Sequence, residues 1–264
     1  PAAQANNPAA MPRSLATWNV NSLKVRLPHL LDWLESVSPD VVCLQELKCD
    51  DAAVPRAEIE AAGYHVISHG QKTYNGVAIL SRQAPAEIVR NIPGLSDPQS
   101  RVIAATIEDT RVVCAYFPNG QAVGSDKFAY KLEWLSALTD YMRGELAHHP
   151  RLVLAGDFNI APEERDAHPD WKEDLLVSPP EREAFSSLRA LGLEDAFRHF
   201  EQSNRSYSWW DYRRNAYRRN FGLRIDHILV SPPLAAQLES CAVDTSPRER
   251  ERPSDHAPVI ARFV

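Results

Sequence analysis

The feature of this sequence that most constrains its fold is a series of short apolar runs that alternate with stretches of helical periodicity. Short apolar runs bounded by turn residues are typical of buried strands. The expected strands cover residues 15–20, 41–45, 76–81, 102–107, 112–117, 152–155, 223–230 and 258–263. Two of these runs are joined through Asp109-Thr110, which predicts an antiparallel hairpin. We therefore expect an α/β fold with mixed sheets and flanking helices.

Three helices are expected between these strands. One helix face is spaced i, i+3, i+4, i+7 and consists of Leu27, Leu30, Leu31 and Leu34. A second helix is marked by Phe128, Leu132, Leu135 and Met142. A third begins at Ser178, which suits an N-cap, with Pro179 in the first turn.

Size and composition favour one globular domain. A chain of 264 residues with 44% hydrophobic residues lies within the range of layered α/β domains, and its composition excludes extensive disorder. No apolar run approaches the ~18 residues of a membrane span. We expect a single domain over residues 11–264, with no partner in a membrane.

The N-terminus and the cysteines bear on the compartment. Residues 1–10 are rich in Pro, Ala and Asn and lack the regions of a signal peptide. We interpret them as a disordered extension or a cloning remnant, with Met11 as the natural start. Cys43 and Cys114 lie in apolar runs, which favours buried thiols and a reducing, cytoplasmic location.

Polar residues stand where the expected strands end. They are Asn19, Gln45-Glu46, Tyr116, Asp157 followed by Asn159, and Asp255-His256 before the final strand. Strand ends in a layered fold converge on one edge, and carboxylates held that close repel one another unless a positive charge lies between them. A hard cation with oxygen ligands, Mg²⁺ or Mn²⁺, satisfies that requirement.

One further carboxylate points to a paired site. Asp226 shares a strand face with Ile228 and Val230, so it is expected to point into the apolar interior. An unpaired buried carboxylate is costly, and His256 is the natural partner. Separately, each residue has a plainer interpretation: Glu46 as a surface turn residue, Asp157 as a cap, and His256 as a core histidine. Together these plain interpretations are hard to sustain.

Other catalytic motifs are missing from the sequence. There is no G-x-S-x-G, no G-x-x-x-x-G-K and no G-x-G-x-x-G. A serine hydrolase, a P-loop enzyme and a dinucleotide-binding enzyme are therefore excluded.

Charge is segregated along the chain. The formal net charge of −6 alone argues against a nucleic-acid partner. Residues 205–224, however, hold six arginines against one acid, interleaved with aromatic residues, so the remainder of the chain carries −11. Arginines neutralise phosphates and aromatic rings stack on bases or sugars, so this arginine–aromatic stretch suits a nucleic-acid groove. The alternative is a solvated arginine face over structural aromatic residues.

At this point the motifs resemble those of the exonuclease III family of abasic-site endonucleases, within the wider superfamily of metal-dependent phosphoesterases. The matching segments run through nearly the whole chain from Met11: Trp18-Asn19-Val20-Asn21, Leu44-Gln45-Glu46, Tyr116-Phe117-Pro118-Asn119-Gly120, Gly156-Asp157-Phe158-Asn159-Ile160, Trp210-Asp211-Tyr212-Arg213, Leu223-Arg224-Ile225-Asp226 and Ser254-Asp255-His256-Ala257-Pro258. The resemblance implies a four-layer α/β sandwich, in which two facing mixed β-sheets are flanked by helices.

The resemblance also implies roles for individual residues. Glu46 would be the main Mg²⁺ ligand, with Asn19 and Asp255 beside it. Asp157 would orient or deprotonate the attacking water. The other implied catalytic residues, which position or bind the phosphate, are Asn159, Tyr116, His256 and Asp226. The implied substrate-binding residues are Asn119 and Arg213, together with an apolar pocket for a flipped-out baseless sugar at Trp209, Leu223 and Ile225.

Two departures from the family pattern bear on substrate choice. Asn21 stands where some relatives carry Asp. The loop before Pro179 carries Leu175-Leu176-Val177, where many relatives have a small residue. A leucine at the pocket mouth would exclude a flipped sugar and favour trimming of 3′ ends.

The leading hypothesis is a Mg²⁺-dependent DNA-repair phosphodiesterase, with Mn²⁺ able to substitute. It would act as a monomer on double-stranded DNA, cleaving 5′ to abasic sites or trimming damaged or recessed 3′ ends as a 3′–5′ exonuclease and 3′-phosphatase. In a bacterium it would associate with the nucleoid. One alternative is restriction to 3′ ends. A phosphoesterase for small or lipid phosphodiesters is less favoured, as is an inactive DNA-binding module, which would lack a catalytic group.

Overall fold

Two six-stranded sheets form the centre of the computed structural model, which describes residues 10–264. The first sheet has the order β11 (Leu238–Val243), β12 (Val259–Phe263), β1 (Ser14–Asn19), β2 (Val41–Gln45), β4 (Val77–Ser81) and β3 (His65–His69). The second has the order β5 (Ala86–Arg90), β6 (Val102–Ile107), β7 (Thr110–Tyr116), β8 (Leu152–Asp157), β10 (Asp226–Val230) and β9 (Glu194–Asp195). β1 pairs with β2, and β7 with β8, in parallel, and the other pairs are antiparallel.

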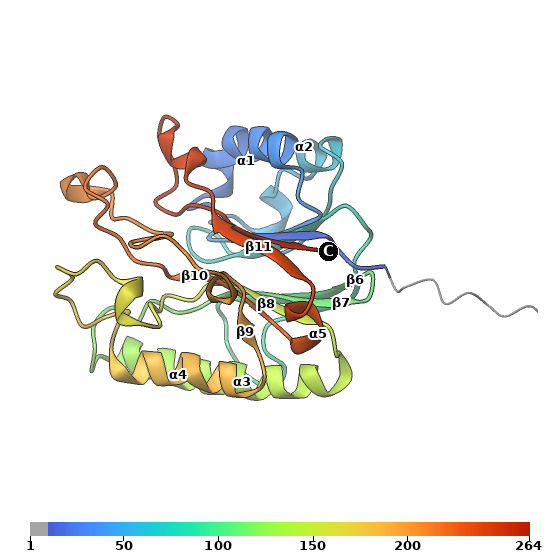
Figure 1. Cartoon of the computed structure of the whole chain (residues 1–264). Coiled ribbons are helices and arrows are strands. Elements are labelled where there is room, and N and C mark those ends of the chain that lie inside the picture. Colours follow the sequence, from blue (N-terminus) through green and yellow to red (C-terminus); the bar gives the residue numbers. More distant parts are fainter. Residues whose placement is uncertain (1–9) are drawn as a thin grey trace, which may run out of the picture.

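Helices cover the outer face of each sheet, as Figure 1 shows. α1 (Leu23–Val37) and α2 (Arg56–Ala61) lie over the first sheet, and α3 (Asp126–His148) and α4 (Pro179–Ala190) lie over the second. A short helix, α5 (Pro232–Ala235), follows β10. The expected four-layer α/β sandwich is therefore confirmed.

The core has three apolar layers because both faces of each sheet are covered. One layer lies between the sheets, one beneath α1 and α2, and one beneath α3 and α4. Strands that are buried on both faces read as continuous apolar runs, which is why the sequence exposes them so clearly. All four cysteines are buried, and none of them forms a disulfide.

The three predicted helices are present, and most of the residues predicted for their apolar faces are buried or partly buried. Ser178 caps α4 in a reciprocal capping box with Glu181, as the sequence indicates. In α3 the buried stripe includes Lys131, whereas Leu132 is only partly buried. Phe128, Leu135 and Met142 are buried as predicted, so only Leu132 lies at the edge of the apolar face.

Several strand predictions also need adjustment. In the β6–β7 hairpin Ile107 pairs with Thr110, so the turn consists of Glu108-Asp109, with Glu108 at a φ of 54°. β10 begins at Asp226, because Leu223 instead forms isolated bridges with Trp209 and Ala167. The sequence did not predict β3, β5, β9 and β11, nor the short helices α2 and α5.

Two other expectations concern the chain as a whole. Among residues 10–264, no helix combines the length and hydropathy that crossing a bilayer demands. The predicted N-terminal extension over residues 1–10 lies outside the described residues except for its last position.

Candidate active site

Four of the predicted residues lie at neighbouring strand ends. At the end of β1 Asn19 pairs with Gln45 of β2, and in the second sheet Asp157 lies between Tyr116 of β7 and Asp226 of β10. The side chains of Asn19 and Asp157 then meet across the two sheets, because Asn19 Nδ2 donates a hydrogen bond of 2.9 Å to Asp157 Oδ2. The predicted convergence of strand ends is therefore confirmed.

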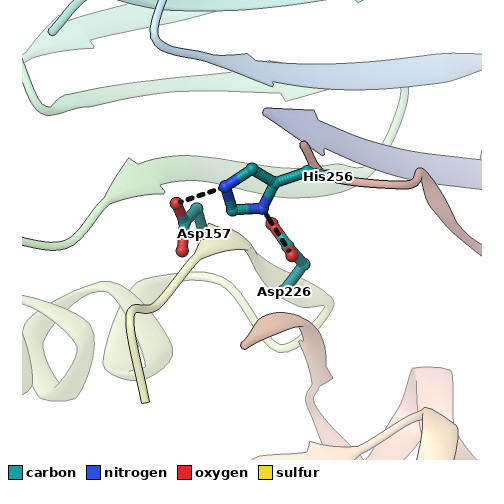
Figure 2. A group of neighbouring side chains, drawn as sticks. All are labelled: Asp157, Asp226 and His256. Atoms are coloured by element: carbon teal, nitrogen blue, oxygen red, sulfur yellow. Dashed lines mark hydrogen bonds and ion pairs between the residues drawn. The ribbon is translucent and has the colours of Figure 1, made fainter. Parts of the chain in front are cut away.

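His256 lies between two carboxylates, as Figure 2 shows. Its Nδ1 is 2.9 Å from Asp226 Oδ2, and its Nε2 is 3.6 Å from Asp157 Oδ2. Asp226 is 1% exposed, so the expected inward direction of this side chain is confirmed. Since both ring nitrogens face acceptors, the ring is held as the doubly protonated imidazolium.

Ser208 completes this arrangement and was not singled out from the sequence. Its hydroxyl donates a hydrogen bond of 2.7 Å to Asp226 Oδ2 and accepts bonds from the backbone N–H groups of Ile225 and Asp226. Ser208 therefore fixes the carboxylate that orients His256. A small hydroxyl residue beside a tryptophan pair carries no motif, so no pattern in the sequence indicated it.

The surrounding charges shift two pKa values strongly. Burial disfavours the imidazolium of His256, but the carboxylates of Asp226, Asp157 and Asp255 outweigh it and raise the pKa to about 10. Burial raises the pKa of Asp157 to about 7. The charges of Asp226 and Glu46 also raise this pKa, whereas the charge of His256 and the hydrogen bond from Asn19 lower it. Asp157 is thus a carboxyl group that exchanges protons near neutral pH.

Glu46 and Asp255 flank this cluster. The phenol of Tyr116 donates a hydrogen bond of 2.7 Å to Glu46 Oε1. Asp255 accepts bonds from Asn21 Nδ2 (3.1 Å) and from Trp209 Nε1 (3.0 Å). The amide of Asn21 therefore holds Asp255 through a hydrogen bond that an aspartate at position 21 could not donate.

The donor set fits a hard divalent cation. The tightest group of ligating atoms is Asp157, Asp226 and His256, which lie within 4.8 Å of one another. A metal binds neutral imidazole, whereas His256 is a charged imidazolium between two carboxylates, so these three residues form an ion-paired cluster. The carboxylates of Glu46 and Asp255 and the amide of Asn19 remain beside it as oxygen donors, and Mg²⁺ prefers oxygen donors.

Asn159 is held by the backbone around it. It has a φ of 50°, its N–H donates to Asp157 Oδ1, and its Nδ2 donates to the carbonyl of Phe117. The second N–H of the amide has room for another acceptor. Asn119 is exposed in the loop after β7, and its Oδ1 accepts from the N–H of Gln121.

Lys131 supports both of these asparagines and was missed in the sequence. Its buried ammonium donates to the carbonyls of Asn159 (2.8 Å) and Asn119 (3.2 Å) and forms an ion pair with Glu181. Glu181 Oε2 in turn accepts from Ser178, the cap of α4. A lysine within the apolar stripe of a helix is the signal that could have identified it.

The three residues predicted for the apolar pocket lie together in one apolar cluster. Leu223 and Ile225 are buried in one cluster with Trp209 packed against them, as expected. Leu176 belongs to the same cluster and is only 5% exposed. Its φ of 74° is rare for a bulky residue, so the loop adopts a strained backbone conformation where this side chain enters the cluster.

The arginine–aromatic stretch of residues 205–224 divides into two parts. Arg224 is buried between Asp166 and Asp195 and cannot face DNA, which corrects its assignment to this surface. Tyr207 and Trp210 are also core residues, so they are structural aromatic residues and not a surface for stacking on bases. The other five arginines are exposed, including Arg213, whose guanidinium pairs with Asp211.

Comparisons with known proteins agree with this geometry. The model of the Endonuclease/Exonuclease/phosphatase family matches residues 16–256. Exodeoxyribonuclease III of Haemophilus influenzae is 38% identical, and the match covers 94% of this chain and 98% of the relative.

Two solved structures are also similar. The 3′ phosphatase NExo from Neisseria, bound to a product DNA hairpin, has a TM-score of 0.93 at 47% identity over 96% of this chain and 99% of the other. An AP endonuclease from Archaeoglobus fulgidus has a TM-score of 0.91 at 36% identity over 95% and 98%. The chain therefore belongs to the endonuclease/exonuclease/phosphatase family, and it is a metal-dependent hydrolytic nuclease.

Proposed function

We propose that this protein is a Mg²⁺-dependent DNA-repair phosphodiesterase that acts at abasic sites and at blocked or recessed 3′ ends of double-stranded DNA. Mn²⁺ would substitute, and the protein would act as a monomer in the cytoplasm. The observation that carries the proposal is the buried Asp226–His256–Asp157 cluster with Glu46 and Asp255 beside it. Attack on a phosphodiester concentrates negative charge on the phosphate oxygens, and this arrangement would stabilise that charge.

Glu46, with Asn19 and Asp255, would hold the metal. When bound, the ion would supply positive charge to the phosphate oxygens and to the leaving oxygen. Tyr116 would act as a neutral hydrogen-bond donor to the phosphate. Burial, and next the charges of Glu46 and Asp157, raise the pKa of its phenol well above the usual range.

Asp157 would accept the proton from the attacking water. A carboxylate with a pKa of about 7 is suited to accept the proton of an attacking water at neutral pH. The Nε2–H of His256 is 3.6 Å from Asp157, longer than a hydrogen bond, so it is free to donate to a phosphate oxygen while Asp226 keeps Nδ1. Asn159 would contribute its remaining N–H to the same oxygens.

The activities of similar proteins support DNA as the substrate. The chain resembles an exodeoxyribonuclease, a 3′ phosphatase bound to DNA and an AP endonuclease over nearly its whole length. The five exposed arginines of residues 205–224 give a phosphate-binding surface that a lipid phosphoesterase has no need for. An inactive binding module is disfavoured because Glu46, Asp157 and His256 are present and gathered together.

A second candidate function, processing of 3′ ends with little abasic-site incision, is favoured by Leu176. This side chain packs in the same buried cluster as Leu223 and Ile225, the two residues predicted to accept a flipped baseless sugar. Removal of a terminal nucleotide or phosphate would not require a flipped sugar in that cluster.

Two substrates test the proposal directly. One is a duplex with a single internal abasic analogue, and the other is a duplex with a recessed end that carries a 3′-phosphate. With Mg²⁺ we expect loss of the 3′-phosphate and slower incision at the analogue, and no reaction in EDTA. Absence of both reactions with Mg²⁺ and with Mn²⁺ would refute the proposed function.

A further inference from the structure

A polar surface pocket of about 600 Å³ lies next to the candidate active site. It is bounded by the loop of residues 211–218 and by the segment of residues 248–253 that precedes β12. In Figure 1 these segments are the orange and red loops that project from the same end of the sheets. The pocket contains none of the residues assigned above to catalysis or to the metal.

Arg248 forms one wall of this pocket and is unusual among the buried cations. It is 7% exposed, and its guanidinium carbon lies 4.6 Å from the ring centroid of Tyr217 and 5.9 Å from that of Tyr212, both of which line the pocket. Its Nη1 donates to the carbonyl of Ser254 at 2.5 Å. Its Nε is buried and has no hydrogen-bond partner among residues 10–264.

The other fully buried cations differ in this respect. Lys131, Arg111 and Arg224 each form an ion pair with a carboxylate, and the Nε of the buried Arg101, which lacks an ion pair, donates to Gln99. Within residues 10–264 no carboxylate oxygen lies within 4.0 Å of a nitrogen of Arg248, and burial lowers its pKa. A buried guanidinium with an unused donor and no counter-ion is costly unless a ligand supplies the acceptor.

The remaining charges of the pocket favour an anion. Arg218 is exposed and forms no ion pair among the described residues, whereas Arg250 already pairs with Asp32. Of the two carboxylates, Asp211 pairs with Arg213, and Glu249 accepts a hydrogen bond of 2.5 Å from Tyr217. Arg218 and Arg248 therefore outweigh Glu249, the one carboxylate of the pocket that lacks a cationic partner.

A short chain of contacts joins this pocket to the site. The Tyr212 hydroxyl lies 3.3 Å from Asn21 Nδ2, which is 3.1 Å from Asp255 Oδ1. Duplex DNA carries one charge per about 1.7 Å of its axis, so a duplex that presents one phosphate to His256 brings others past the neighbouring surface.

Resting on the proposed function, we propose that this pocket binds a backbone phosphate of the DNA other than the one that is cleaved. Arg248 supplies a stacked, preorganised guanidinium at its wall, and Arg218 supplies an exposed charge at its mouth. The planar fork of arginine suits phosphate, and stacking on two rings fixes its direction.

The test uses wild-type protein in EDTA, so that binding is measured without cleavage, and a duplex in which single phosphates are replaced by uncharged methylphosphonate. At one position outside the scissile phosphate we expect roughly tenfold weaker binding. In Arg218→Ala and in Arg248→Lys the same replacement should cost less than about threefold, because the partner is already lost. Arg218→Ala should also reduce the salt slope of log K by about 0.9.

Two further variants sharpen the result. Glu249→Gln removes the opposing charge and should tighten binding, and Arg189→Ala, an exposed arginine on α4, should leave the methylphosphonate pattern unchanged. The proposal is overturned if every methylphosphonate position costs the same in Arg218→Ala as in wild type. Because these readouts need no catalysis, that failure is distinct from a failure to cleave DNA in Mg²⁺.

Discussion

His256 and Asp226 form an ion pair that joins the two sheets of the sandwich. His256 precedes β12 of the first sheet, Asp226 opens β10 of the second, and Nδ1 lies 2.9 Å from Oδ2. The bond between Asn19 and Asp157 crosses between the sheets in the same way. The geometry of the site is therefore set by how the sheets pack, and both sheets must be in place for the cluster to exist.

Replacement of Asp226 by Asn should lower kcat by about 10²–10⁴-fold. The amide would hold the imidazole ring of His256 in the wrong protonation state while leaving its position nearly unchanged. KM should change little. Single-turnover cleavage of a duplex with a 3′-phosphate measures this, with Asp195→Asn as a control for loss of a buried carboxylate away from the reaction. A rate within twofold of wild type in Asp226→Asn would contradict the orienting role.

Replacement of Lys131 by Met should destabilise the protein by about 3–5 kcal/mol, because it leaves Glu181 buried without its cation. The double variant Lys131→Met/Glu181→Gln should recover a large part of this loss. Chemical denaturation of the two variants and of wild type checks the prediction. Equal stability of the single and double variants would show that the pair is not coupled.

The buried His227 predicts a pH dependence of stability. Its Nδ1 faces Arg224, its Nε2 donates to the carbonyl of Ile160, and burial with the charge of Arg224 lowers its pKa to about 4. Below pH 6.5 the unfolded state binds a proton that the folded state does not, so stability is full above pH 6.5 and falls as the pH drops toward 4.

The contribution of His227 to the free energy of unfolding changes by about 3 kcal/mol over this pH range. Denaturation of His227→Gln at pH 7 and at pH 4.5 should show a smaller loss than wild type, whereas His65→Gln, an exposed histidine, should follow wild type. An identical pH dependence in all three proteins would rule out His227 as the source.

Replacement of Leu176 by Gly should increase incision at an internal abasic analogue by roughly tenfold, because it opens the space beside Trp209. Glycine also accepts the φ of 74° without strain. Removal of a 3′-phosphate should stay nearly constant. Leu146→Ala, a partly buried leucine of α3 in another apolar layer, is the control, and equal ratios of the two activities in all proteins would exclude Leu176 as the barrier.

The sequence predicted the site well where it follows from strand geometry. Asn19, Tyr116 and Asp157 each end a strand, and the inward direction of Asp226 follows from the two-residue period of a strand. The layer architecture followed from apolar runs buried on both faces. These features depend on local pattern, which one sequence contains.

Features that depend on tertiary contacts escaped prediction. β5 (Ala86–Arg90) is an edge strand with mostly exposed residues, so it lacks an apolar run. Ser208 acquires its role only because β10 brings Asp226 beside it. Arg224 looked like part of a basic surface because its partners, Asp166 and Asp195, are far away in the chain.

The central claim is that Asp157 activates the water that attacks the phosphate, and the rate of cleavage in Asp157→Asn tests it most directly. Measured under single-turnover conditions with Mg²⁺ on a duplex with a recessed 3′ end, the variant should lose about 10³-fold or more in rate. Its affinity for the same DNA should stay within a few-fold of wild type, and Asp140→Asn on the exposed face of α3 should cleave normally. A wild-type rate in Asp157→Asn would contradict the proposed mechanism.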